Sequence, residues 1–259
     1  MNAADYLRQH RCHDVAFLVK RWQAVARAAR LDVQTVYVSG DYPVLFLHTR
    51  KPEGPRLYLS AGVHGDEAAP VSALLEWAED NTTLLRTLPV AIFPIFNPSG
   101  LALNTRADHK GIDLNRRFHD ENHPHIRAWW KAVGEMRFSH GICLHEDYDG
   151  QGIYCYELSR SRRLDMADAL LRACEGHIPR DRRGNIDGRV VRNSFFLRRK
   201  PPDLPGMPEA IALYMHSTDH TMTFETPSEY SLADRVAAQR AFVEGVVAGV
   251  TCRMAPVPA

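Results

Sequence analysis

Residues 56–76 read RLYLSAGVHGDEAAPVSALLE, and this stretch decides the fold. Its opening apolar run, Leu57–Leu59, predicts a short buried strand. A helical pattern begins at Ala68, and His64-Gly-Asp-Glu67 lies between the two. Open α/β sheets bind their ligands in turns that follow the carboxyl ends of strands. The turn at His64 is therefore a candidate site.

This turn carries an imidazole and a carboxylate three residues apart, and such a pair can supply two ligands to one zinc ion. We expect Gly65 to let the backbone fold tightly enough for His64 and Glu67 to converge. A histidine and a glutamate at this spacing also occur in ordinary solvated turns. The stretch alone leaves both interpretations open, and the later segments bear on the choice.

The composition of the chain excludes several classes of protein. It has 259 residues, 45% hydrophobic and 24% charged, with a net charge of +1, which is ordinary for a globular chain. No overall field selects nucleic acid or an anionic membrane. No apolar run approaches the roughly 20 residues that span a bilayer, and the first residues lack a signal-peptide core. We expect a cytoplasmic protein without a nucleic-acid or membrane partner; the oligomeric state is not readable.

The cysteines indicate no function. They are odd in number and widely spaced, and no Cys-x-x-Cys occurs, so neither a thiolate zinc site nor a redox pair is suggested. Free thiols in a reducing compartment account for them. The five positions are Cys12, Cys143, Cys155, Cys174 and Cys252.

Helical and strand patterns alternate along the chain. Helices are expected at 14–30 (capped by Asp14), 68–80, 125–138, 163–175 and 231–250 (capped by Ser231). Strands are expected at 35–38 and 44–48 (a hairpin), 57–59, 90–96, 141–144, 152–158 (pairing with 141–144) and 221–224. The polar segment 101–124 is expected to be an irregular loop. This alternation predicts one α/β domain over residues 1–259 with a mixed, largely buried sheet.

Three of the predicted strands end in polar groups that a core would not hold without reason. One is followed by His64 and Glu67, the second by His145 and the third by Glu225. Two histidines and a glutamate that leave one position to water form a catalytic zinc set. Zinc lowers the pKa of such a water and polarises a carbonyl oxygen. A further carboxylate, for which Glu225 is the candidate, can take the proton from the water.

The loop after Asn97 adds cations suited to a substrate with a carboxylate. Arg106 can stabilise a tetrahedral oxyanion. Arg116, adjacent to Asn115, can hold a carboxylate through a bidentate fork. Taken alone, each arginine is as well explained by a surface ion pair.

Six spaced motifs now stand in one order: His64-Gly-Asp-Glu67, Asn97-Pro-Ser-Gly100, Arg106, Gly111-Ile-Asp-Leu-Asn-Arg116, His145 and Glu225. Together they resemble the zinc metallocarboxypeptidases of peptidase family M14. The resemblance implies a mixed, mostly parallel sheet of roughly eight strands flanked by helices. It implies that His64, Glu67 and His145 bind one Zn²⁺ per chain and that Glu225 is the general base.

The same resemblance implies roles for the cations and for the substrate. Arg106 would polarise the scissile carbonyl, and Asn115 with Arg116 would grip the terminal carboxylate of a small peptide or amino-acid derivative. A C-terminal residue would be removed by a zinc-activated water, without a covalent intermediate.

Two alternatives stay open. His64-Gly-Asp-Glu-Ala-Ala-Pro70 also resembles the succinylglutamate desuccinylases and aspartoacylases, which keep the zinc set but cleave N-acyl amino acids. The other alternative is a binding module that retains the fold without turnover. Because Glu225 would be superfluous in a closed structural zinc site, we favour an enzyme.

The tyrosine that caps the substrate in carboxypeptidases has no clear counterpart. Tyr214 precedes Glu225 but fits a core strand position, whereas Tyr154, Tyr156 and Tyr230 match no motif. Glu146 and Asp147 are candidates for orienting His145.

Other charged residues have simpler readings. His216 and His220 are expected to flank a strand rather than bind a second metal, and His109, His119, His123 and His125 to be solvated, with His109 near enough to line a pocket. Residues 160–200 carry twelve basic and five acidic side chains. Solvated surface is the expected reading, a pocket rim that selects acidic substrates the sharper one, and a nucleic-acid groove the least favoured.

Overall fold

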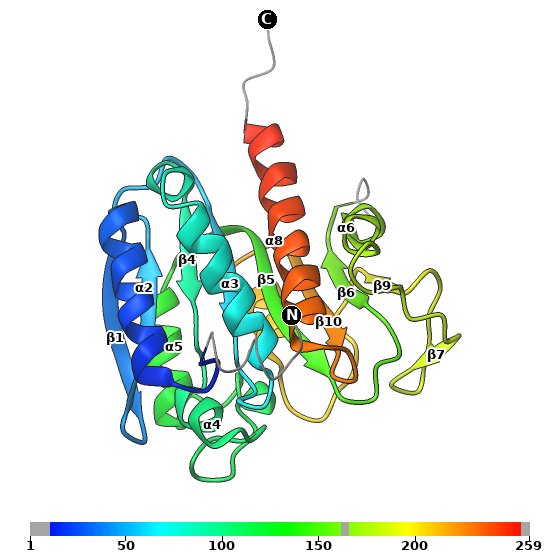
Figure 1. Ribbon diagram of the computed structural model, residues 1–259, viewed down its shortest axis with the longest axis horizontal. Coiled ribbons are helices and arrows are strands. Elements are labelled where there is room, and N and C mark those ends of the chain that lie inside the picture. Colours follow the sequence, from blue (N-terminus) through cyan, green and yellow to red (C-terminus); the bar gives the residue numbers. More distant parts are fainter. Residues whose placement is uncertain (1–10, 162–165, 255–259) are drawn as a thin grey trace, which may run out of the picture.

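The computed structural model describes residues 11–161 and 166–254, and side chains as far as residue 251. Its main sheet has eight strands in the order β1-β2-β4-β3-β5-β10-β6-β9 (Figure 1). These are β1 (Asp32–Ser39), β2 (Tyr42–His48), β4 (Val90–Phe93), β3 (Arg56–Ala61), β5 (Phe138–Asp147), β10 (His220–Pro227), β6 (Tyr154–Ser159) and β9 (Phe195–Arg198). Four of the seven pairings are parallel. The expected mixed, mostly parallel sheet is confirmed.

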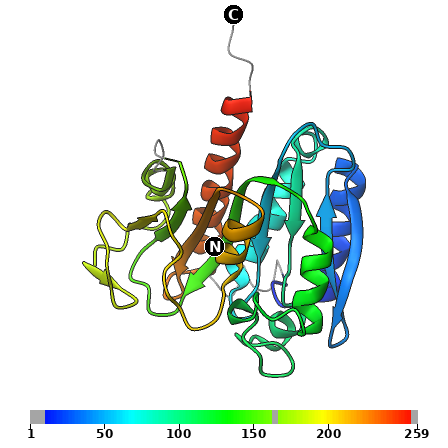
Figure 2. The ribbon, with the colours of Figure 1, turned by 180° about the vertical axis from the view of Figure 1, so that it is seen from behind.

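Helices cover both faces of the sheet. One face carries α2 (Val15–Ala29), α3 (Ala68–Asp80), α6 (Met166–Cys174) and α8 (Leu232–Met254). The other face carries α5 (Pro124–Val133) and α7 (Glu209–His216), which lie toward the viewer in Figure 2. Shorter elements are η1 (Leu84–Arg86), α4 (Pro98–Leu103), η2 (Leu114–Arg116) and the hairpin of β7 (Asn185–Ile186) and β8 (Arg189–Val190).

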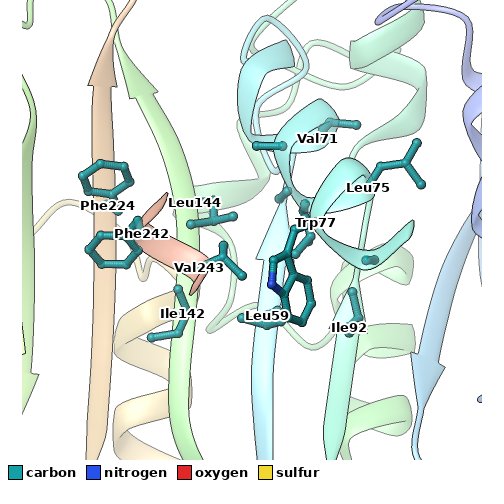
Figure 3. Close-up of a cluster of buried hydrophobic side chains, with 14 of the residues drawn as sticks. Leu59, Val71, Leu75, Trp77, Ile92, Ile142, Leu144, Phe224, Phe242 and Val243 are labelled. Carbon is teal, nitrogen blue, oxygen red and sulfur yellow. The ribbon is translucent and has the colours of Figure 1, made fainter. Parts of the chain in front are cut away.

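The larger core lies between the sheet and the layer of α3 and α8. Leu59, Ile92 and Ile142 on the strands meet Trp77 of α3, and the ring of Phe224 stacks at 4.1 Å on that of Phe242 (Figure 3). Burial of each such side chain stabilises the fold by about 1.5–3 kcal/mol. This packing fixes the central strands, whose ends carry the polar residues.

Local signals at the N-terminal half act as expected. The side chain of Asp14 accepts a hydrogen bond from the Phe17 N–H at 2.9 Å and so caps α2. The hairpin of β1 and β2 turns at Gly40, whose φ of +61° is accessible to glycine at little cost. Helix α3 has the expected bounds.

Two expected boundaries were wrong. The helix expected at 125–138 ends at Val133, since Gly134 adopts φ +48°, and Phe138 already begins β5. The expected loop after Asn97 contains α4, because the Asn97 side chain accepts from the Gly100 N–H at 3.0 Å and Pro98 occupies the first turn. Asparagine followed by proline was therefore a helix start rather than a turn.

The pairing of the strand expected at 152–158 was also wrong. Strand β6 pairs with β10 and β9, because β10 lies between β6 and β5. The turn Asp187-Gly188 joins β7 and β8 with φ +52° and +70°, a signal that could have predicted this hairpin. Helix α6 falls within the expected 163–175, of which residues 163–165 lie outside the described residues.

Cys12, Cys143, Cys155 and Cys174 are buried free thiols, as expected for scattered cysteines; the side chain of Cys252 lies outside the described part. Across the described ranges, none of the helices combines the length and the apolarity that crossing a membrane requires.

Candidate active site

The candidate site residues meet at one edge of the sheet. Strands β3, β5 and β10 are parallel neighbours, so their carboxyl ends lie side by side. His145 on β5 stands in register with Glu225 on β10. His64 and Glu67 occupy the turn between β3 and α3. This edge is where α/β sheets bind their ligands.

Three of these side chains form a compact group of metal-binding atoms. Nδ1 of His64 lies 2.5 Å from Oε1 of Glu67, and Nδ1 of His145 lies 3.0 Å from Oε2. One ligand atom from each residue falls within 4.8 Å of the others, and all three side chains are buried. Glu67 Oε2 has no hydrogen-bond partner, although it is buried. Two imidazoles and a carboxylate suit zinc and leave a fourth position for water, so these residues fit the ion.

The electrostatics of the group favour a cation. Burial alone would raise the pKa of Glu67, but the charges of His64 and His145 lower it to about 2. Burial raises the pKa of Glu225 well above its usual range, and the negative charges of Glu67 and Asp147 add to this effect. A divalent cation beside Glu67 would counter that repulsion and restore the ionised form of Glu225.

Gly65 serves a different purpose from the one expected. A Cβ atom at this position would lie 1.9 Å from the carbonyl carbon of Gly100. The glycine thus permits the His64 turn to touch the backbone of α4. The motif at Asn97-Pro-Ser-Gly100 supports the metal turn through this contact.

Asp113 was missed as a site residue. Its Oδ1 lies 3.3 Å from Nε2 of His64, on the nitrogen that does not face Glu67. Its Oδ2 lies 3.1 Å from Nε of Arg106. Its position two residues before Asn115 in the Asp-Leu-Asn-Arg run was the available signal. Asp113 therefore orients both a candidate metal ligand and a candidate catalytic arginine.

Helix α8 supports the end of β5. Gln239 Nε2 donates to the His145 carbonyl at 2.7 Å and to Thr226 Oγ1 at 3.0 Å. Glu146 accepts from Arg235 at 2.5 Å and from the Ala69 N–H at 3.1 Å, which caps α3 in place of Glu67. The side chain of Asp147 accepts from the Tyr154 hydroxyl at 2.9 Å. Glu146 and Asp147 were expected to orient His145, yet their carboxylates bind these other groups.

A cavity of about 420 Å³ opens in front of the group. Every candidate residue lines it: His64, Glu67, Arg106, Asn115, Arg116, His145 and Glu225. Oδ1 of Asn115 accepts from the Glu209 N–H at 2.9 Å, which leaves its Nδ2 free to face the cavity. Arg116 donates to the Asn115 carbonyl at 3.0 Å and has no carboxylate within 4.0 Å among the described residues. The structure thus brings together all the residues that the sequence singled out.

The tyrosines divide into two groups. Tyr154 and Tyr156 line the cavity, with their hydroxyls donating to Asp147 and Asp187. Tyr214 lies on α7 rather than on a strand, and its hydroxyl donates to the Arg199 carbonyl at 2.6 Å. Tyr230 does not line the cavity.

The other histidines are largely structural. His216 ends α7 against Trp130, and His220 begins β10 with Nε2 2.7 Å from Glu157, so they flank a strand as expected. In the described ranges only His64, Glu67 and His145 could together hold a metal. His125 was wrongly expected to be solvated.

His125 is buried on α5, stacked on Tyr37 and Phe96. His109 does not line the cavity; its Nδ1 lies 3.2 Å from Ser99 Oγ.

The comparisons with known proteins agree with this geometry. Residues 53–132 match the succinylglutamate desuccinylase/aspartoacylase catalytic domain. A segment of 113 residues is 31% identical to murein peptide amidase A of Vibrio campbellii and spans 40% of this chain and 43% of that protein. A candidate metallopeptidase structure from Shewanella amazonensis superposes with a TM-score of 0.81 at 21% identity, covering 91% of this chain and 93% of that one.

A metallo-carboxypeptidase from Pseudomonas aeruginosa, in complex with (2-guanidinoethylmercapto)succinic acid, superposes with a TM-score of 0.58 at 16% identity over 91% of this chain and 68% of that one. The chain has the metallocarboxypeptidase fold. The resemblance to peptidase family M14, with features of the succinylglutamate desuccinylase/aspartoacylase branch, is confirmed. Within this fold the matched residues 53–132 include His64, Glu67, Arg106, Asn115 and Arg116.

Proposed function

We propose that this chain is a zinc-dependent hydrolase that cleaves an amide bond next to a free carboxylate, releasing a C-terminal residue from a peptide or peptide-like substrate. The observation that carries the proposal is the position of Glu225. Its side chain lines the same cavity as the three metal-binding side chains and stands in register with His145. A site that only stored a metal would need no additional carboxylate there.

His64, Glu67 and His145 would hold the zinc ion, which supplies a Lewis acid for the scissile carbonyl and lowers the pKa of water. Glu225 takes a proton from the attacking water and passes it to the departing nitrogen. Arg106, held by Asp113, donates to the carbonyl oxygen as negative charge develops on it. Water supplies the hydroxyl of the new acid and both protons are conserved.

Arg116 and Nδ2 of Asn115 bind the substrate carboxylate. Arg116 lacks a carboxylate partner in the described residues, and Asn115 is held by the Glu209 N–H with its donor group available. A guanidinium beside an amide donor matches the geometry of a carboxylate. The substrate is thereby placed with its amide bond toward Glu225.

A second candidate activity is the hydrolysis of an N-acyl amino acid. The match of residues 53–132 to the succinylglutamate desuccinylase/aspartoacylase domain favours it. The machinery at His64 and Glu225 would be the same, and only the group on the far side of the amide would differ. Substrates of both kinds therefore belong in the first screen.

Metal analysis and one substitution test the proposal. Wild-type protein is expected to hold about one zinc per chain, and His64→Ala to hold none. Glu225→Gln should retain zinc while its turnover falls by a factor of about 10²–10⁴. Glu229→Gln, four residues along and outside the cavity, is the matched control and should keep both properties.

Absence of zinc in both wild type and His64→Ala after incubation with the metal would refute the metal site. Zinc-loaded wild type that cleaves neither peptides nor N-acyl amino acids would favour a binding module on this fold. Unchanged turnover in Glu225→Gln would remove the base from its role.

A further inference from the structure

Most basic side chains of residues 160–200 already have acidic partners. Arg160 pairs with Asp219, Arg180 with Asp168, and Arg183 with Asp181. Arg198 differs from these three: it lines the cavity, and no carboxylate of the described residues lies within ion-pair distance of it. A cation in a cavity wall without a partner is free to bind an anion from the substrate.

The strand register fixes where Arg198 lies. On β9 it pairs with Leu158 of β6, and Leu158 pairs with Thr221 of β10. Arg198 is therefore four residues from Glu225 along the strand direction, about 13 Å. Phe196 and Arg198 share the face that lines the cavity, and the ring of Phe196 stacks at 4.6 Å on Tyr156.

Apolar side chains surround this end of the cavity. Leu158, Leu204 and Ile211 pack together there and also line the cavity; we name them the side chamber. Apolar walls reduce the screening of a charge by water, so a carboxylate beside Arg198 is bound more strongly than at an open surface.

The side chamber is joined to Arg116 by one loop. Leu204 and Pro205 line the cavity, and the Met207 N–H donates to the Arg116 carbonyl at 3.2 Å. A Cβ atom on Gly206 would lie 2.4 Å from that carbonyl oxygen, so the loop touches Arg116 closely. One loop therefore forms both the wall of the chamber and the support of the proposed carboxylate site.

We infer that the preferred leaving group is an amino acid with an anionic side chain, whose second carboxylate enters the side chamber and binds Arg198. The inference rests on the proposed function and names the substrate class of the same site. Arg116 and Asn115 hold the α-carboxylate, while Arg198 reads the side chain. Arg189, which also lines the cavity, adds a second positive charge on the β7–β8 hairpin.

Matched acid and amide substrates test this inference. The probes are N-acetyl dipeptides that end in glutamate or glutamine, and in aspartate or asparagine, together with the corresponding N-acetyl amino acids. Zinc-loaded wild type should prefer the acid in at least one of these pairs by about 10- to 100-fold in kcat/KM, the range that one hydrogen-bonded charge provides. Calorimetric binding of free L-glutamate and L-glutamine supplies a readout that needs no turnover.

Arg198→Ala should bring the acid-to-amide ratio close to one, and Arg198→Glu should turn the preference toward a lysine side chain. That reversal is a gain that misfolding does not produce. Arg199→Ala, the neighbouring arginine outside the cavity, should keep the wild-type ratio.

A wild-type enzyme that cleaves acids and amides equally would overturn the inference and leave the hydrolase proposal intact. An unchanged ratio in Arg198→Ala would do the same. Failure of wild type to cleave or bind any of the probes would instead remove the proposed function, and the inference with it.

Discussion

Asp113 Oδ1 lies 3.3 Å from Nε2 of His64, while Nδ1 of the same ring lies 2.5 Å from Glu67. The ring is thus held from both sides, with one nitrogen toward the candidate metal position and the other toward a carboxylate. Such an outer carboxylate fixes the orientation and the tautomer of a metal-binding histidine. Asp113 also holds Arg106, so metal and substrate chemistry share one support.

Asp113→Asn should weaken zinc binding by about 10- to 100-fold, because the amide orients His64 less strongly than the carboxylate does. Competition with a chelator of known affinity measures the change. Asp120→Asn, on the same loop but outside the cavity, is the matched control. Equal zinc affinity in the two variants would contradict the role of Asp113.

Arg235→Met should lower the free energy of unfolding by about 3–5 kcal/mol, because it leaves the carboxylate of Glu146 buried and unpaired. Burial raises the pKa of Glu146 to about 7 even beside Arg235, so urea denaturation is best measured at pH 8, where Glu146 is ionised. Arg240→Met removes a partly exposed arginine from the same helix and should cost no more than about 1 kcal/mol. Similar losses in both variants would mean that the buried pair has no special weight.

Asn115→Asp should raise KM by about 10-fold or more with a smaller change in kcat. The new carboxylate can still accept from the Glu209 N–H, but it replaces the Nδ2 donor and repels the substrate carboxylate. Steady-state kinetics of the zinc-loaded enzyme measure the change, with the exposed Asn122→Asp as control. An unaltered KM would remove Asn115 from the carboxylate site.

His125→Phe should make stability less sensitive to mild acid. Burial lowers the pKa of His125 to about 3, whereas an unfolded histidine titrates near 6.5. Below pH 6.5 the unfolded chain takes up a proton that the native chain does not, so this contribution, complete above pH 6.5, is lost as pH falls toward 3. Between pH 7 and pH 5 the loss is about 2 kcal/mol.

Phenylalanine has no proton to gain and can stack between Tyr37 and Phe96 in the same way. Urea denaturation at pH 7 and pH 5 should therefore show a smaller drop for the variant than for wild type. The same drop in both proteins would refute this account. The exposed His119→Phe is the control and should match wild type.

The expectations that held rest on short-range signals. Asp14 and Ser231 cap their helices with neighbouring backbone groups, and Gly40 turns its hairpin within a few residues. The failures involve contacts between distant segments. Strand β10 separates β6 from β5, and no local pattern records which of several strands is inserted between two others. His125 stands in a polar stretch, yet its burial depends on Tyr37 and Phe96 from other elements.

The sequence by itself determined the residue types of the site and their placement at strand ends: His64 and Glu67 after one strand, and His145 and Glu225 at the ends of two others. A periodic apolar pattern and its interruption are local properties, and local forces act on them directly. Only the tertiary structure decided that β3, β5 and β10 are neighbours and that Asp113 stands behind His64. It also decided that Arg198, about 130 residues further along the chain, shares a cavity with His64. These juxtapositions arise from the packing of the whole sheet between its helices.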